Sequence, residues 1–221
     1  MSRRSRNPPG GFVYHILNRA NRRETLFDSA GDYCGLLRVV RETLLSYPMR
    51  ILEYCLMPNH WHFMMWPQED GQLAAFMHHM TTTHASRWNK WRGLTGHVYQ
   101  GPYKSFPVEQ DDHYYTLARY IVRNPRRANL VTSAEAWPWS SLHARTNQTQ
   151  WASLLSDGPL RLPSNWIEYV NQPQTDAELA AIRRHIARGQ PFGEQQWSEQ
   201  VAKQLGIEES LRRPGRPRHE K

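Results

Sequence analysis

The chain has 221 residues, of which 39% are hydrophobic and 22% charged, a balance that supports a folded core and excludes global disorder. It contains no apolar run of about 18 residues, the minimum for a membrane span, and its charged start is not followed by an apolar stretch, so we expect neither a membrane helix nor a secretory signal. Two cysteines are too few for a disulfide framework, which favours a reducing cytoplasm.

The net charge of +8 is concentrated at the two ends of the chain. Residues 1–23 carry six arginines and no acidic residue, and residues 211–221 carry five Lys or Arg and one Glu, which leaves the middle at −2. Basic tails on a nearly neutral body are typical of proteins that bind a polyanion. Neither tail continues into an amphipathic helix, so we expect nucleic acid rather than a membrane surface as the partner.

The first 110 residues predict four strands and two helices in the order strand, helix, strand, strand, helix, strand. Short apolar runs rich in β-branched and aromatic residues indicate the strands, and apolar residues at i, i+3, i+4 and i+7 indicate the helices. The predicted strands are residues 12–18, 49–57, 61–66 and 98–108, and the predicted helices are residues 30–47 and 72–91. This order predicts an α+β, ferredoxin-like split βαβ fold, with an antiparallel sheet and helices on one face.

A third helix is predicted from the capping residues Asp111 and Asp112 to Asn124, because Pro125 disfavours helical geometry at the residue before it. Residues 141–175 lack periodicity and predict a loop-rich linker that wraps the domain. Residues 176–188 and 194–205 have helical spacing and are each followed by glycine. They predict a small helical module, residues 176–210, which is a candidate for DNA binding.

The strongest chemical signal is the pair His60 and His62, two residues apart on a predicted strand. Strand alternation places both imidazoles on the same face, about 6.5–7 Å apart along the strand, where they can bind one metal ion. An isolated His-x-His pair is more often two partly buried histidines with ordinary hydrogen bonds, so the metal hypothesis needs support from elsewhere in the chain.

That support comes from Tyr120 and Asn124, which are four residues apart and therefore share a face of the third helix. Asn124 offers a neutral carbonyl oxygen as a third ligand. Three neutral ligands leave the metal its full charge, and Mg²⁺ or Mn²⁺ suits phosphate oxygens. The Tyr120 hydroxyl can then attack phosphorus and form a covalent phosphotyrosine.

Two motifs together, Met57–Phe63 (MPNHWHF) and Arg119–Ala128 (RYIVRNPRRA), resemble those of the REP-associated tyrosine transposases. This family belongs to the single-tyrosine HUH (His-hydrophobic-His) superfamily of IS200-like transposases, and the resemblance covers residues 12–140. Asn124 matches the REP-associated branch, since insertion-sequence relatives more often have Gln there.

The resemblance implies a catalytic domain that cuts and rejoins single-stranded DNA at palindromic hairpins of repetitive extragenic elements. It implies a divalent metal, Mg²⁺ or Mn²⁺, held by His60, His62 and Asn124, with Tyr120 as the nucleophile. It also implies a bacterial cytoplasmic protein associated with the nucleoid. Either a monomer or a homodimer is compatible with the sequence.

Arginines beside the second motif and in both tails are predicted to contact DNA. They are Arg3, Arg4, Arg6, Arg119, Arg123, Arg126, Arg127, Arg212, Arg213, Arg216 and Arg218. The last four include the arginine of a Gly-Arg-Pro core, Arg216, and its basic neighbours, a pattern that resembles an AT-hook, whose arginines enter a narrow A·T minor groove. A basic tail attracted only to phosphate is the alternative. The predicted organisation is therefore a basic arm (1–11), a catalytic domain (12–140), a linker (141–175), a helical module (176–210) and an AT-hook-like tail (211–221).

Two other functions are compatible with the sequence. One is a non-catalytic nucleic-acid-binding module of RRM-like shape, with aromatic residues exposed on the sheet for base stacking. The other is a metal-dependent phosphodiesterase in which water, rather than Tyr120, attacks the phosphate. The Tyr-x-x-x-Asn pattern beside His-x-His favours the tyrosine enzyme over the stacking module, because stacking requires no metal ligands.

Overall fold

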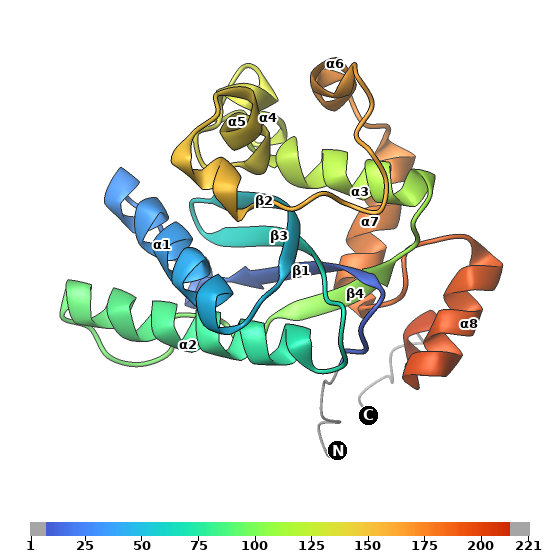
Figure 1. Cartoon of the computed structure of the whole chain (residues 1–221), viewed down its shortest axis with the longest axis horizontal. Coiled ribbons are helices and arrows are strands. Elements are labelled where there is room, and N and C mark those ends of the chain that lie inside the picture. The colour runs from blue at the N-terminus through green and yellow to red at the C-terminus, as the bar shows by residue number, and fades with distance from the viewer. Residues whose placement is uncertain (1–7, 213–221) are drawn as a thin grey trace, which may run out of the picture.

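A computed structural model describes residues 8–212 of the chain. Of the arginines predicted to bind DNA, those in the two tails, apart from Arg212, lie outside the described residues. One antiparallel sheet has the strand order β2-β3-β1-β4, which confirms the ferredoxin-like arrangement (Figure 1). Its strands are β1 (Val13–Arg19), β2 (Arg50–Met57), β3 (His60–Trp66) and β4 (Lys104–Val108).

Two long helices, α1 (Ala30–Ser46) and α2 (Gln72–Arg92), cover one face of the sheet. The side chain of Ser29 begins α1 through a capping box with Asp32, and Gly93 ends α2 in the left-handed conformation (φ 62°). These two helices connect strands of the split βαβ units, as the sequence predicts.

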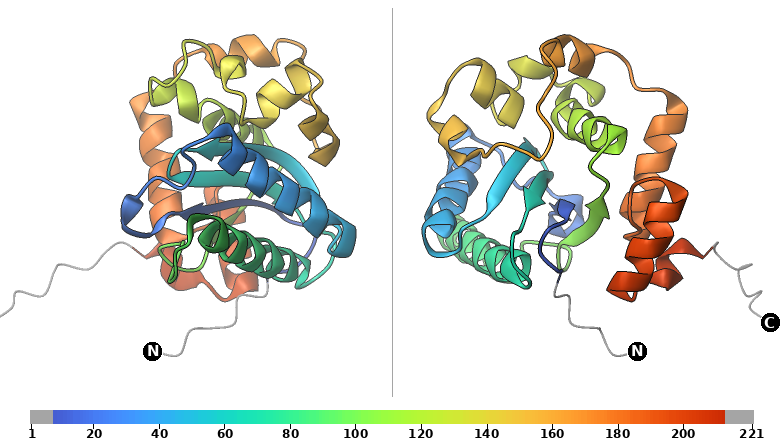
Figure 2. Two further views of the ribbon diagram at one scale, coloured as in Figure 1. Left: turned by 90° about the vertical axis from the view of Figure 1, so that its left-hand side faces the viewer. Right: turned by 45° about the vertical axis from the view of Figure 1, so that its right-hand side comes forward.

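The opposite face of the sheet is also covered by helices (Figure 2). The prediction of helices on one face is therefore correct for the two crossover helices and wrong for the rest. On this second face lie α3 (Asp112–Val122) and α7 (Asp176–Arg188), and α6 (Trp166–Asn171) packs on the outside of α3. The physical reason lies in the strands, because β2 and β3 are buried along almost their whole length. Strands with apolar side chains on both faces require cover on both.

Two predicted boundaries differ from the structure by more than one residue. The fourth strand begins at Lys104 rather than at residue 98, because Gly101 and Pro102 interrupt the pairing, and only a single bridge joins Tyr99 to Ala20 before them. The third helix ends at Val122, and a short helix, α4 (Asn124–Arg127), follows after Arg123. Pro125 is tolerated in its first turn, where no intrahelical N–H bond is lost.

The predicted linker contributes to the core. Two short helices, α5 (Ser141–Thr146) and the 3-10 helix η3 (Gln150–Leu154), pack against the edge strand β2, and Trp151 and Leu154 join the core under α1. The Leu56 N–H donates to the Trp139 carbonyl at 2.9 Å, and the Ser156 N–H donates to Ile51 at 2.8 Å. These bonds cover the otherwise open edge of β2. Other 3-10 helices are η1 (Asn21–Arg23), η2 (Ala134–Ala136) and η4 (Glu208–Leu211).

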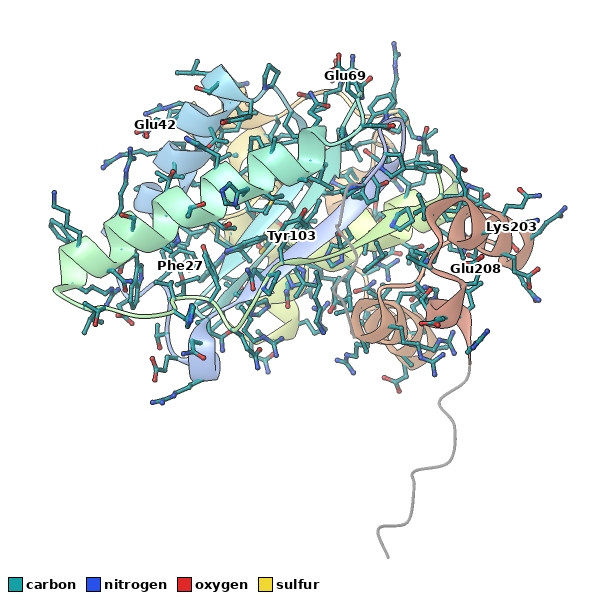
Figure 3. All side chains as sticks on the ribbon, turned by 90° about the horizontal axis from the view of Figure 1, so that it is seen from below. Phe27, Glu42, Glu69, Tyr103, Lys203 and Glu208 are labelled. Carbon is teal, nitrogen blue, oxygen red and sulfur yellow. The ribbon has the colours of Figure 1, made fainter. Side chains whose placement is uncertain are left out.

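Both predicted C-terminal helices form, but they pack on the domain rather than apart from it. Ile182 of α7 joins the core of the second face, and Phe192 exchanges backbone hydrogen bonds with Pro107 and Glu109 at the β4 edge. The second helix, α8 (Gln195–Leu205), follows at the periphery, as seen from below with Lys203 labelled (Figure 3). No helix in residues 8–212 is long and apolar enough to span a bilayer.

Candidate metal and nucleophile site

The strand register places the two histidines of the first motif at the beginning of β3. His60 pairs with Arg19 of β1, and His62 pairs with Leu17. The two imidazole rings are 5.0 Å apart between centroids and lie at 82° to one another. They share the face of the sheet that α3 covers, as the alternation of a strand requires.

The end of α3 brings the second motif to these histidines. The Tyr120 ring meets His62 edge to face, with ring centroids 5.9 Å apart, and the amide nitrogen of Asn124 lies 3.4 Å from His60 Nε2. All four residues line one cavity of about 770 Å³. The structure therefore brings together every residue that the sequence predicts for the nucleophile and the metal.

Both histidines present neutral nitrogens to this cavity. Burial, followed by the charges of Arg19 and Arg127, lowers the pKa of His60 to about 4. Burial also holds the pKa of His62 well below its usual value. The Nδ1 of His60 lies 2.7 Å from Asn59 Oδ1, and because a carbonyl oxygen can only accept, Nδ1 carries the proton and Nε2 keeps its lone pair.

The side-chain amide of Asn124 points its nitrogen toward His60. Its Oδ1 accepts a hydrogen bond from Arg127 Nη2 at 2.8 Å, which directs Nδ2 toward His60. A half turn about the Cβ–Cγ bond would present the oxygen to a metal and release Arg127. With that turn, two imidazole nitrogens and one amide oxygen form a donor set that fits a divalent ion with open positions for phosphate.

Arg127 contacts both motif residues of the third helix region. Its guanidinium lies 4.2 Å from the centroid of the Tyr120 ring while it donates to Asn124. Burial lowers its pKa, the nearby Tyr120 opposes that shift, and the charge of Arg183 adds to it. The Tyr120 hydroxyl makes no hydrogen bond with any residue between positions 8 and 212 and is therefore available to a ligand.

Helix α7 supplies one wall of the cavity, through Arg183, Ile186 and Ala187. Neither sequence motif contains these residues, and the sequence did not predict them in the site. Arg183 and Ala187 are four residues apart and share a helical face, but that spacing does not say which element the face meets. His15 is another residue that the sequence did not predict in the site, and its Nε2 lies 2.9 Å from His62 Nδ1.

The predicted DNA-binding arginines of α3 and α4 differ in their surroundings. Arg123, Arg126 and Arg127 line a second cavity of about 550 Å³, and Arg127 lines both. Burial and three neighbouring arginines lower the pKa of Arg123, so an anion there would relieve repulsion. Arg119 is buried, donates to the Pro173 carbonyl at 2.8 Å and lies over the Tyr169 ring. The carbonyl of Arg212 accepts from Arg188 at 3.4 Å.

A separate group of metal-capable side chains, Glu109, Asp111 and His113, lies near the beginning of α3. The carboxylate oxygens of this group already make hydrogen bonds within the fold. Asp111 caps α3 and contacts His113 Nδ1 at 2.9 Å, and Glu109 accepts the Glu194 N–H at 2.7 Å. None of the three lines the cavity that holds Tyr120.

Comparisons with known proteins agree with this fold. The family model described as "Transposase IS200 like" matches residues 11–124, more than half of the chain. A solved REP-associated tyrosine transposase bound to a REP hairpin is 19% identical, with a TM-score of 0.54, and the match covers 80% of this chain and 99% of that one. A candidate transposase from Deinococcus radiodurans is 13% identical, with a TM-score of 0.39, covering 58% and 92%. No curated protein matches the chain.

Proposed function

The chain belongs to the IS200-like transposase family, and from that premise we propose that it cuts and rejoins single-stranded DNA through a covalent bond to Tyr120. The observation that carries the proposal is the meeting of Tyr120 with His60, His62 and Asn124 in one cavity. These side chains come from two elements, β3 and the α3–α4 turn, and together they provide a nucleophile and a set of metal ligands.

The chemistry follows from the position of Tyr120. Its oxygen attacks the phosphorus of a strand in the cavity, the new O–P bond forms, and the P–O bond to the leaving deoxyribose oxygen breaks. The phenol proton passes to water, and the leaving oxygen takes up a proton to become a free hydroxyl. A divalent ion, Mg²⁺ or Mn²⁺, on His60, His62 and Asn124 would supply positive charge that stabilises the phosphate oxygens during the transfer.

Rejoining is the same step in reverse. The hydroxyl of an incoming strand attacks the phosphotyrosine, and Tyr120 leaves with a proton restored to its oxygen. The ester stores the energy of the broken phosphodiester, so no nucleotide cofactor is needed. DNA transposition requires cutting and joining of strands, and one tyrosine can carry out both steps.

The arginines near the cavity indicate where the DNA strand would lie. We propose that Arg123, Arg126 and Arg127 in the second cavity, with Arg183 on α7, bind phosphates on the approach to Tyr120. Arg119, whose guanidinium is buried against Pro173 and Tyr169, instead holds the C-terminal segment. The structural relative described as bound to a REP hairpin supports hairpin DNA as the substrate. We expect the hairpin to need unpaired flanks, because the strand that Tyr120 attacks must enter the cavity.

The covered sheet argues against an RRM-like stacking module. Such modules stack bases on an open sheet face, whereas here α1 and α2 cover one face and α3 and α7 cover the other. A phosphodiesterase with water as the nucleophile shares the same ligands, and covalent trapping separates it from the tyrosine enzyme.

The test uses labelled hairpin DNA with single-stranded flanks, Mn²⁺ and a denaturing gel. We expect the natural chain to form a covalent adduct and Tyr120→Phe to form none, while hairpin binding stays within about threefold because only one oxygen is lost. Tyr115→Phe is the matched control, since Tyr115 lies on the same helix with its hydroxyl bonded to Arg161. Cleavage at the normal rate by Tyr120→Phe, or equal cutting of a fully paired duplex, would contradict the proposal.

A further inference from the structure

We propose that His15 is a positioning residue for the metal ligand His62. By accepting a hydrogen bond at its Nε2, His15 would hold the proton of His62 on Nδ1 and so keep the lone pair of His62 Nε2 directed at the cavity. This inference rests on the proposed function, in which His62 binds the divalent ion, and adds a residue that neither motif contains.

The contact is a direct one between two buried rings. His15 lies on β1 on the same face of the sheet as His62, and His15 Nε2 is 2.9 Å from His62 Nδ1. The rings lie within 15° of parallel with centroids 5.1 Å apart, and the nitrogen separation is that of a hydrogen bond. His15 has no solvent exposure, and His62 has 3%.

Counting protons leaves one arrangement compatible with a metal. A neutral imidazole carries one N–H, and the His15–His62 bond contains one proton. If His15 donated it, the proton of His62 would sit on Nε2 and block the ligand position. If His62 donates from Nδ1, its Nε2 is free to bind, and His15 carries its own proton on Nδ1.

His60 has an equivalent partner. Its Nδ1 lies 2.7 Å from Asn59 Oδ1, which fixes the same tautomer by the same means. Metal-binding histidines are commonly oriented in this way by a hydrogen bond at the nitrogen that does not bind the metal. His15 would do for His62 what Asn59 does for His60.

The environment of His15 indicates that the fold alone does not select an imidazole there. Its Nδ1 is buried without a hydrogen-bond partner in residues 8–212, and its ring packs 4.9 Å from that of Phe106. A buried unpaired polar nitrogen costs free energy that an apolar side chain would avoid. The hydrogen bond to His62 is therefore the interaction that accounts for an imidazole at this position.

The experiment measures Mn²⁺ binding to the full chain without DNA, by the electron paramagnetic resonance signal of free Mn²⁺. His15→Phe removes the acceptor and keeps a ring, and we expect the affinity to fall about 10–100-fold. His15→Gln places an amide oxygen near the former Nε2, and we expect binding within about threefold of the natural chain, as for other retained outer contacts. His84→Asn, which changes a buried histidine on the other face of the sheet, is the control and should bind Mn²⁺ normally.

A second readout reports the tautomer without metal. Long-range ¹H–¹⁵N spectra of histidine-labelled protein should show His62 protonated on Nδ1 in the natural chain and in His15→Gln, and a changed population in His15→Phe. An Nε2–H tautomer in the natural chain, or unchanged Mn²⁺ affinity in a folded His15→Phe, would overturn the role of His15. Unchanged affinity in His62→Ala would instead overturn the proposed metal site, so the two failures are distinguishable.

Discussion

The amide of Asn124 lies between Arg127 and His60, and this position restricts which side chains the site accepts. Its oxygen accepts from Arg127 at 2.8 Å, and its nitrogen lies 3.4 Å from His60. An amide can exchange these two ends by a half turn, which would let the proposed metal ligand serve Arg127 without a metal and bind the metal when it is present. A carboxylate has two oxygens that accept but no N–H to direct at His60, and alanine has neither group.

Substitution of Asn124 should therefore separate metal binding from catalysis. We expect Asn124→Ala to lose more than about tenfold in Mn²⁺ affinity, because two imidazoles alone hold a labile ion poorly. Asn124→Asp should keep Mn²⁺, since one carboxylate oxygen can bind it while the other pairs with Arg127. Its added negative charge should still slow cleavage by opposing the incoming phosphate.

The measurements are Mn²⁺ binding without DNA and single-turnover cleavage of a hairpin. His79→Ala is a suitable control, because His79 lies on α2, across the sheet from Tyr120. If Asn124→Ala binds Mn²⁺ as tightly as the natural chain does, Asn124 is not a metal ligand.

At the level of elements, an ion pair attaches α5 to the sheet. Arg145 donates to Glu53 of β2 at 2.8 Å, and the Glu53 side chain is only 1% exposed. Ser141 also donates to the same carboxylate. Through these contacts the segment after residue 140 packs onto the sheet rather than forming a separate connection to the next module.

Removal of Arg145 should be costly. Arg145→Met leaves the Glu53 carboxylate buried without its countercharge, and we expect a loss of about 3 kcal/mol in the free energy of unfolding. Adding Glu53→Gln to Arg145→Met should recover part of it, because the neutral amide has a smaller desolvation cost. The measurement is equilibrium unfolding in urea.

The comparison is Arg87→Met, which breaks the Arg87–Glu42 pair between side chains that are 56% and 49% exposed. That loss should stay below about 1 kcal/mol. Equal losses from Arg145→Met and Arg87→Met would mean that the Glu53 pair does not hold α5 on the sheet.

Local signals in the sequence predict helices and strands better than they predict the tertiary contacts between them. Helix α7 runs over the predicted residues, because Thr175 caps its start and Gly189 ends it. Tyr120, His60 and His62 could be predicted as candidates because each motif lies within a few residues of chain. The α7 wall of the cavity and the His15–His62 contact join residues from separate elements, and neither periodicity nor capping encodes such tertiary contacts.

At the scale of the whole molecule, we expect stability to fall in acid because the fold buries neutral histidines. Burial lowers the pKa of His15 to about 3 and that of His84 to about 4. In the unfolded chain these groups titrate near pH 6.5. Between about pH 6.5 and pH 4 the unfolded chain binds protons that the folded chain excludes, so the free energy of unfolding falls as the pH falls, by at most about 1.4 kcal/mol per pH unit for each histidine.

The contribution of His84 can be measured by itself. His84 Nδ1 contacts the Tyr99 hydroxyl at 2.7 Å, and in His84→Asn an amide can occupy that position without titrating. Urea unfolding between about pH 7 and pH 5 should show a shallower pH dependence for His84→Asn than for the natural chain. His78→Gln, an exposed position on the same helix, should change nothing. Identical slopes for the natural chain and His84→Asn would contradict the prediction.

The charge of the chain is distributed unevenly at the largest scale. The ends carry the net positive charge while the middle sums to −2, yet Arg127, Arg183 and Lys104 line the cavity that contains Tyr120. No acidic residue among positions 8–212 lines that cavity, and four glutamates lie in the α8 region, at Glu194, Glu199, Glu208 and Glu209. We therefore expect the cavity to select the reacting strand and the tails to supply much of the non-specific affinity.

Deletion of residues 211–221 tests this division, because it removes five Lys or Arg. Each phosphate neutralised adds about −0.7 for single strands or −0.9 for duplex to the slope of log K against log salt, so if about three of these side chains pair with phosphate, the slope should flatten by roughly 2–3 units. Hairpin selectivity should change less, since phosphate contacts position the protein without specifying sequence. The measurement is a salt titration of binding for both chains on A·T-rich and G·C-rich probes. An A·T preference that disappears with the tail would support minor-groove binding. A flattened slope with no A·T preference in either chain would mean that the tail contacts phosphate alone. An unchanged slope would mean that the tail does not contact DNA.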